Sequence, residues 1–111
     1  MKISTHLLDT SLGKPGQGIP VTLESIGTDG AGTACGAGVT DADGRVASLS
    51  ETSLEPGDYR LTFATAAYFE AAHGTVFYPR IVLYISLPAA RDHFHIPVLA
   101  STFSYSTYLG S

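Results

Sequence analysis

The chain of 111 residues has a single cysteine, few charges and no long hydrophobic run, and each shortage excludes a class of protein. Cys35 cannot form an internal disulfide, so the chain is not a disulfide-stabilised scaffold, and a lone cysteine fits a reducing compartment better than a secreted one. Six Lys and Arg residues against ten Asp and Glu provide no basic surface for nucleic acid. No apolar run approaches the roughly 20 residues of a membrane span, and residues 1–6 lack the apolar core of a signal peptide. We therefore expect a cytoplasmic protein with no nucleic-acid and no membrane partner.

The size and the apolar content favour one folded domain, which we expect to span residues 1–111. Hydrophobic residues make up 44% of the chain, which excludes disorder. A chain of this length buries roughly 65% of its unfolded surface, enough to fold without metals or disulfides. Because charged residues are only 14% of the sequence, a monomer would leave much uncharged surface exposed. We expect another copy of the chain to cover part of that surface.

Short segments in which apolar and polar residues alternate recur along the chain, separated by clusters of Gly, Pro and Asp. A period of two is typical of strands with one buried face. The clearest segments are residues 3–8, 21–26, 33–40, 59–64, 81–87, 92–100 and 103–109. Residues 81–87 are apolar throughout, so we expect that strand to be covered on both faces, and residues 13–18 are expected to form a loop. The pattern predicts an all-β, two-sheet sandwich of about eight strands.

One segment breaks the alternation and predicts a short helix around Thr65–His73. It is rich in alanine, begins at the capping residue Thr65 and ends before Gly74. His73 would then lie in the last turn, where a cation interacts favourably with the helix C-terminus.

The segment 92–100 carries the most informative pattern. Its even-numbered residues from Phe94 to Ala100 form an apolar core face, which places His93 and His95 together on the opposite face. Two imidazoles at this spacing lie within about 7 Å of one another. Such a pair is compatible with a metal site, with acid–base catalysis, or with two solvated polar residues. A metal site is disfavoured because the pattern supplies no carboxylate or cysteine ligand beside the histidines.

Other residues of chemical interest stand apart in the sequence. Arg45 directly follows a predicted tight turn at residues 41–44, and His6 lies on the polar side of the first strand. Alone, both are as readily explained as solvated surface groups. Beside a substrate, the fixed donor fork of an arginine would hold oxygen atoms in a set geometry. Pro97 removes a ladder donor, so we expect its strand to lie at an edge or to be interrupted there.

The last predicted strand, 103–109, alternates so that Ser106 and Tyr108 share one face and Leu109 lies on the other. No Gly-x-Ser-x-Gly elbow, phosphate-binding loop, Cys-x-x-Cys pair or zinc helix motif occurs. Ordinary serine hydrolases, nucleotide enzymes and zinc proteases are therefore not supported.

Four segments of the chain occur in the order found in one protein family. They are STHLLDTSLGKP at residues 4–15, TDADGR at 40–45, HFHIP at 93–97 and SYSTY at 104–108. Together they resemble the 5-hydroxyisourate hydrolases, the enzyme relatives of transthyretin. Each segment is a weak match by itself, but four in order, over nearly the whole chain, are strongly specific.

The resemblance implies a transthyretin-like β-sandwich that assembles as a homotetramer, a dimer of dimers, with an open channel between the dimers. Members of the family open the ring of 5-hydroxyisourate in urate degradation and produce 2-oxo-4-hydroxy-4-carboxy-5-ureidoimidazoline, without a cofactor or a metal. The essential residues of the family correspond to His6, Arg45 and His95. Residues expected to bind the substrate are Tyr108, Ser111, Ser106 and His93.

The residues suggest a mechanism for this reaction. A neutral histidine, either His95 or His6, would take a proton from the water that attacks the ring carbonyl. Arg45 would hold the developing oxyanion or the acidic ring oxygens of the substrate.

Two positions depart from the pattern of the family. Leu109 replaces the arginine of the usual Tyr-Arg-Gly-Ser ending, and Thr102 stands where proline is common. The alternative to an active enzyme is therefore a catalytically weakened, transthyretin-like protein that binds small molecules. Retention of His6, Arg45 and His95 favours the enzyme.

Overall fold

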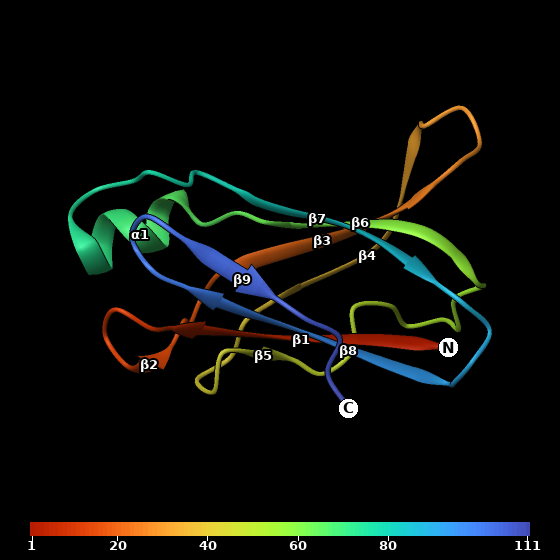
Figure 1. Ribbon diagram of the computed structural model, residues 1–111, viewed down its shortest axis with the longest axis horizontal. Coiled ribbons are helices and arrows are strands. Elements are labelled where there is room, and N and C mark those ends of the chain that lie inside the picture. Colours follow the sequence, from red (N-terminus) through yellow and green to blue (C-terminus); the bar gives the residue numbers. More distant parts are fainter.

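The computed structural model describes residues 1–111 as two β-sheets packed face to face, with one helix at an end of the sandwich (Figure 1). The elements in chain order are β1 (Lys2–Asp9), β2 (Lys14–Pro15), β3 (Pro20–Ile26), β4 (Gly32–Val39), β5 (Arg45–Val46), β6 (Gly57–Phe63), α1 (Ala66–His73), β7 (Ile81–Leu87), β8 (His93–Ala100) and β9 (Tyr105–Thr107). The predicted all-β sandwich with one short helix is confirmed. No helix of the structure is long and apolar enough to cross a membrane.

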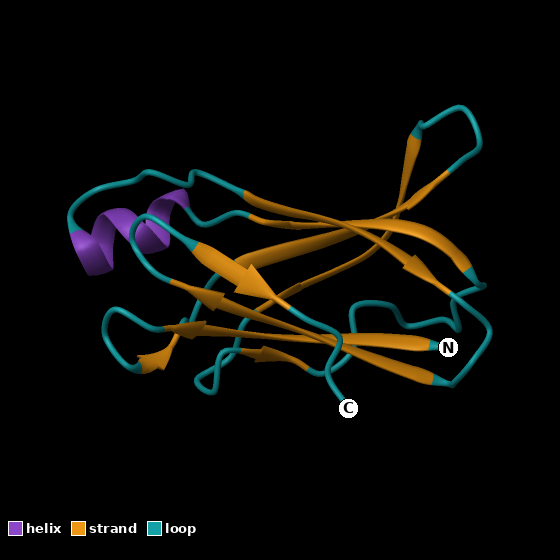
Figure 2. Cartoon of the chain, viewed as in Figure 1, coloured by secondary structure: helices purple, strands orange, loops and turns teal.

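The two sheets differ in strand order and in strand direction. One contains the strands in the order β2-β1-β8-β9, with β5 also paired to β1, and the other has the order β4-β3-β6-β7. Strands β1 and β8 run parallel, and all other pairs are antiparallel. Figure 2 shows these two layers of strands, with the helix beside one end. We call the sheet that contains β1 and β8 the site sheet, because it carries the histidines discussed below.

The core between the sheets is a single cluster of 19 buried hydrophobic residues. Alternation predicted its faces correctly, since Ile3 and Leu7 of β1 and Phe94 and Val98 of β8 are at most 1% exposed. Burial of each large apolar side chain contributes roughly 1.5–3 kcal/mol. The opposite face of the same two strands is thereby left for polar groups.

The prediction that residues 81–87 are covered on both faces is wrong. In β7 the residues Ile81 and Leu83 are buried in the core, but Val82 and Tyr84 are 44% and 58% exposed. The face of β7 that carries Val82 and Tyr84 is exposed to solvent, because no further layer packs on the outside of this sheet.

Two other predicted segments differ in extent. The loop at residues 13–18 contains the two-residue strand β2, which pairs with the end of β1. The last strand is limited to β9, because the Ser101 N–H bonds the Ser104 carbonyl and so closes a turn before it. The prediction for the strand of Pro97 is wrong: β8 lies between β1 and β9, and its pairing with β1 continues through Pro97. Only the pairing with β9 stops short of the proline, at Val98.

Helix α1 matches the prediction and has His73 in its last turn, but the His73 side chain also has partners outside the helix. Its side chain is only 5% exposed, and its Nε2 lies 2.7 Å from Oδ2 of the buried Asp9. Its Nδ1 lies 2.8 Å from the hydroxyl of Thr102. His73 therefore joins the helix to β1 and to the loop before β9. Gly74, with φ of 73°, ends the helix in the left-handed conformation.

Candidate active site

Pairing on both sides of β1 brings the predicted catalytic residues together. In the antiparallel pair with β5, His6 lies opposite Arg45. In the parallel pair with β8, Ser4 lies opposite His95. Residues 4, 6 and 95 share the face of the site sheet that points away from the core. Segments about forty and ninety positions along the chain from His6 thus meet on one surface.

The turn before Arg45 fixes where its strand begins. The Asp41 carboxylate accepts hydrogen bonds from the N–H groups of Asp43 and Arg45, at 2.8 and 3.0 Å. These bonds hold the pKa of Asp41 below its usual value. Gly44 has φ of 74°, and a Cβ there would lie 2.5 Å from the Leu7 carbonyl, so the turn needs glycine. The turn predicted from Asp and Gly spacing therefore positions Arg45 against β1.

His93 and His95 share one hydrogen-bond partner. The Ser4 hydroxyl oxygen lies 2.7 Å from Nε2 of His93 and 2.8 Å from Nδ1 of His95. Ser4 is only 6% exposed, whereas His95 is half-buried and His93 is exposed. Since Nδ1 of His95 is engaged, Nε2 is the nitrogen left to act on another molecule.

The surroundings of His95 favour its neutral form. Partial burial lowers its pKa, and the nearby charge of Arg45 lowers it further, with smaller contributions from His6 and His93. The rings of His6 and His95 are stacked with their centroids 6.5 Å apart. A neutral imidazole is the form that accepts a proton.

These groups line a cavity of about 390 Å³ on the site sheet. Its walls include four of the seven predicted site residues, namely Arg45, His93, His95 and Ser111. His6 is not in the wall, but its ring is stacked on that of His95, which is. The tail that carries Ser111 is held against β8 by a 2.8 Å hydrogen bond from Gly110 N–H to the His95 carbonyl. A Cβ at Gly110 would lie 3.0 Å from His95, so a glycine permits this close approach.

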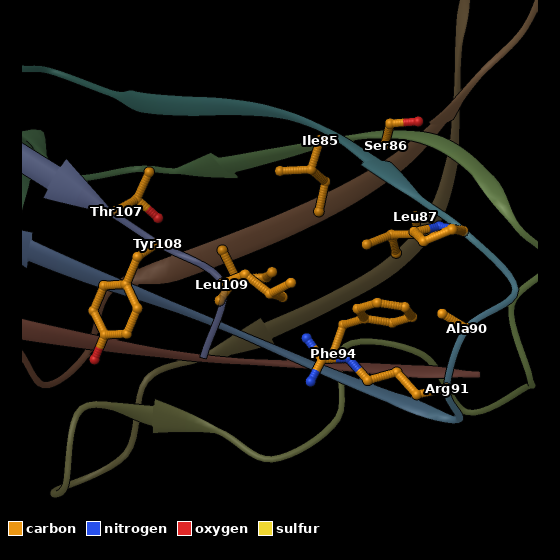
Figure 3. A pocket seen from close by; sticks show the side chains of 11 residues that line it. Ile85, Ser86, Leu87, Ala90, Arg91, Phe94, Thr107, Tyr108 and Leu109 are labelled. Carbon is orange, nitrogen blue, oxygen red and sulfur yellow. The ribbon is translucent and has the colours of Figure 1, made fainter. Parts of the chain in front are cut away.

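The other two predicted substrate-binding residues lie elsewhere. Ser106 is exposed on β9 and lines none of the cavities. Tyr108 lines a separate apolar cavity of about 490 Å³ that also includes Leu109, Phe94 and residues of β7. In Figure 3 Leu109 lies between Tyr108 and Phe94, and the Tyr108 ring points away from the other labelled side chains. The structure therefore does not bring Ser106 and Tyr108 to the histidines within one chain.

Sequence reasoning did not select the other five residues of the cavity wall, which are Ser4, Thr5, Asp41, Val46 and Ala47. Of these, Ser4 and Asp41 are hydrogen-bonded to predicted site residues. Ser4 had a signal, because it lies two positions before His6 on the same face of β1. Its contact with both histidines depends on the parallel register of β1 and β8, which alternation alone does not specify. No group of three or more His, Cys, Asp or Glu side chains is arranged to hold a metal ion.

A β-sandwich that carries a half-buried neutral imidazole, a second imidazole and a guanidinium around one cavity has the groups required for general-base attack by water on a polarised carbonyl. The fold and these groups together define the class of protein, a β-sandwich hydrolase. The chain belongs to the HIUase/Transthyretin family, whose profile matches residues 3–110.

Named relatives agree with this assignment. The 5-hydroxyisourate hydrolase of Salmonella typhimurium is 41% identical over 110 residues, which are 98% of this chain and 80% of that protein. The structure of Klebsiella pneumoniae 5-hydroxyisourate hydrolase has a TM-score of 0.86 at 36% identity, over 99% of this chain and 98% of that one. Sea bream transthyretin, solved in complex with thyroxine, has a TM-score of 0.88 at 28% identity, over 97% and 93% of the two chains. The predicted family is confirmed.

Proposed function

We propose that this protein hydrolyses 5-hydroxyisourate and thereby acts in urate degradation. The observation that carries the proposal is the cavity in which Arg45 and the half-buried His95 meet, with His6 stacked on His95. It occurs in a chain whose relatives at 41% identity are named for that reaction. The product is 2-oxo-4-hydroxy-4-carboxy-5-ureidoimidazoline.

In the proposed mechanism His95 is the general base. Its lowered pKa favours the unprotonated form, and its Nε2 is not occupied by Ser4. It takes a proton from water as the oxygen attacks the ring carbonyl. Arg45 stabilises the negative charge that develops on the carbonyl oxygen. His6 lies beside His95 and orients the ring or the water, and Ser111 contacts the substrate from the tail.

The reaction as proposed relies on the protein's own side chains and needs no cofactor or metal. Addition of EDTA should therefore leave the rate unchanged. We also propose that residues 1–111 act as one catalytic domain and that the protein works in the cytoplasm, where a lone, half-buried Cys35 stays reduced.

We further propose that the active form is a homotetramer, a dimer of dimers. Strands β7 and β9 are the terminal strands of the two sheets, so both have unpaired edges. Beside these edges, Phe77, Phe103 and Tyr105 are 59%, 65% and 38% exposed. Pairing of two copies along β7 and β9 would cover these aromatic rings, and it would bring Ser106 and Tyr108 toward a second chain.

A second candidate function is binding without catalysis. The apolar cavity that contains Leu109 and Phe94 has the volume of a small-molecule site, and Leu109 stands where the family has arginine. An apolar molecule bound there would not touch His95, which lines the other cavity.

The two candidates are separated by the ultraviolet decay of freshly generated 5-hydroxyisourate with and without the protein. Because the substrate decays unaided, the excess rate is the quantity to compare. We expect a large excess that survives EDTA and falls by at least about a hundredfold in His95→Ala. No excess from a folded wild-type protein would exclude the hydrolase and leave the binding function.

A further inference from the structure

The Ser4 hydroxyl is the link between the two histidines of β8. It contacts Nε2 of His93 and Nδ1 of His95 at 2.7 and 2.8 Å, and no other hydrogen bond to either ring is present. Ser4 is 6% exposed and sits within β1, so its backbone is fixed by the parallel pair with β8. The hydroxyl is therefore held in place between two imidazole rings, each of which can accept or donate through its ring nitrogens.

The number of available protons limits the hydrogen-bond arrangements that this bridge can adopt. A hydroxyl has one proton to donate, and each neutral imidazole has one protonated and one unprotonated nitrogen. In one arrangement, His95 donates from Nδ1 to Ser4, and Ser4 donates to Nε2 of His93. In the reverse arrangement, His93 donates to Ser4 and Ser4 donates to His95. The tautomers of the two histidines are thus coupled through one oxygen atom.

Only the first arrangement leaves a lone pair on Nε2 of His95. The reverse arrangement places a proton on that nitrogen, and such an imidazole cannot accept a proton from water. Arg45 lines the same cavity as His95, and its positive charge favours a lone pair over an N–H group there. The bridge therefore determines whether His95 is a base at all.

We propose that Ser4 is a positioning residue that fixes His95 as the Nδ1–H tautomer and relays a proton between His95 and His93. This inference rests on the proposed hydrolase function and adds two residues to its mechanism. His93, which the sequence analysis expected to bind substrate, becomes the outer end of a proton relay.

The relay balances over one turnover. As water attacks the carbonyl carbon, one water proton goes to Nε2 of His95, and the hydroxide oxygen forms the new bond to carbon. At the same time the Nδ1 proton of His95 moves to Ser4 Oγ, and the Ser4 proton moves to Nε2 of His93. When the carbon–nitrogen bond of the ring breaks, Nε2 of His95 gives its proton to the departing nitrogen. The two relay protons then return, and all three residues regain their starting state.

The charges around the bridge explain why the relay is useful. The charged or titratable groups near His95 are Arg45 from β5, His6 from β1 and His93 from its own strand, and Asp41 and Ser111 also line the cavity. A positive charge left on His95 would be partly buried beside the Arg45 guanidinium. The same charge on His93 is exposed to water, where a cation is better solvated.

The first test needs no substrate. Nitrogen-15 NMR of the wild-type protein distinguishes protonated from unprotonated ring nitrogens in each histidine. We expect His95 to have its proton on Nδ1 and His93 to have an unprotonated Nε2. In Ser4→Ala we expect His95 to move to the Nε2–H tautomer, which free imidazole prefers. On acidification the signals of His93 and His95 should titrate as a coupled pair in the wild type and independently in the variant.

The second test is kinetic and uses matched variants. Ser4→Ala should lower kcat about tenfold with KM changed less than about twofold, because the substrate contacts remain. Ser4→Thr keeps a hydroxyl and should restore most of kcat. Ser25→Ala, the same change on β3 of the other sheet, should leave kcat unchanged. In the double variant of Ser4 and His93 the two losses should not add, since each single change already breaks the relay.

The outcomes separate this inference from the proposed function. An Nε2–H tautomer of His95 in the wild type, or a Ser4→Ala enzyme with normal kcat, would overturn the relay while the hydrolase stands. An inactive wild-type protein with the expected tautomers would overturn the hydrolase and the proton transfers, and would leave the tautomer coupling.

Discussion

His95 acts as a base only while it is unprotonated, and its surroundings extend the pH range in which this holds. Burial and the charge of Arg45 both lower its pKa below the ordinary value of 6.5. A lowered pKa means that the neutral form persists as the pH falls. We therefore expect kcat/KM to stay level from about pH 8 down to about pH 6.5 and to decrease below it, as a pH–rate profile would record.

Removal of the arginine charge provides the control for this profile. In Arg45→Gln, the midpoint of the His95 titration followed by NMR should move to higher pH, because one of the two main causes of the shift is gone. A profile whose acid limb lies above pH 7 in the wild type would contradict the assignment of His95 as the base.

Replacement of Leu109 by the arginine of the family pattern tests whether this departure weakens the site. The Leu109 side chain lines the apolar cavity with Phe94 and Tyr108, while His95 and Arg45 line the other one. We expect Leu109→Arg to change kcat/KM by less than about threefold, since no group near His95 is altered. A gain of tenfold or more, measured beside an unchanged His95 titration, would show that the natural leucine limits catalysis.

At the scale of elements, one buried network joins helix α1 to the site sheet. The Asp9 carboxylate is completely buried and accepts hydrogen bonds from Tyr68 and His73, and Thr102 contacts the other nitrogen of His73. Thr102 is the second position that departs from the family pattern, and a proline there could not supply this hydroxyl. The substitution therefore adds a contact between the helix and the loop before β9.

Removal of the Thr102 hydroxyl measures the strength of this contact. Thr102→Val keeps the shape but leaves Nδ1 of the buried His73 without a partner, so we expect a loss of about 1–2 kcal/mol in the free energy of unfolding by urea. Thr22→Val, on the exposed face of β3, is the matched control and should change stability by less than about 0.5 kcal/mol. Equal effects of the two changes would mean that the contact contributes nothing.

The same network predicts how stability responds to acid. Burial by itself would raise the pKa of Asp9, but the hydrogen bonds from Tyr68, His73 and the Leu12 N–H outweigh it and lower the pKa below 3.8. A carboxyl whose pKa is lower in the folded state stabilises the fold above its unfolded pKa, and that contribution is lost as the pH falls through the folded value. Urea unfolding from pH 6 to pH 2.5 should show this loss, and Tyr68→Phe should show a smaller one. An identical pH dependence in both proteins would exclude Asp9 as its source.

The strands and the helix also show which features of the structure can be predicted from alternation in the sequence. It placed Phe94 in the core and both His93 and His95 opposite, because side-chain direction in a strand is a local property. For Tyr108 it assumed a strand to residue 109, whereas β9 ends at Thr107, so alternation does not determine the direction of that side chain. The Asp9–His73 pair spans 64 positions, and only the packing of the helix on β1 brings it together. Contacts of this kind depend on tertiary register, which no local pattern specifies.

For the whole molecule, the exposed aromatic residues lie on one side, near β7 and β9, the terminal strands of the two sheets. The rings of Phe77 and Phe103 are 5.7 Å apart, and the rings of Tyr78 and Tyr105 are 5.0 Å apart. These pairs connect the segment before β7 with β9 and the turn before it. A chain with only 14% charged residues has little polar surface to surround such a group. Association through this side would remove apolar area from water and pair two open strand edges at once.

One substitution on each side of the molecule tests that proposal. Phe103→Glu places a charge among the exposed rings and should convert a species of four 11.6-kDa chains into smaller ones, as sedimentation or light scattering would detect. Val39 is 59% exposed on β4, at the opposite edge of its sheet from β7, so Val39→Glu adds the same charge and should leave the mass unchanged. Both variants should remain folded, because neither side chain belongs to the core. If Phe103→Glu kept the mass of the wild type, or if the wild type were a monomer, association through the β7 and β9 edges would be excluded.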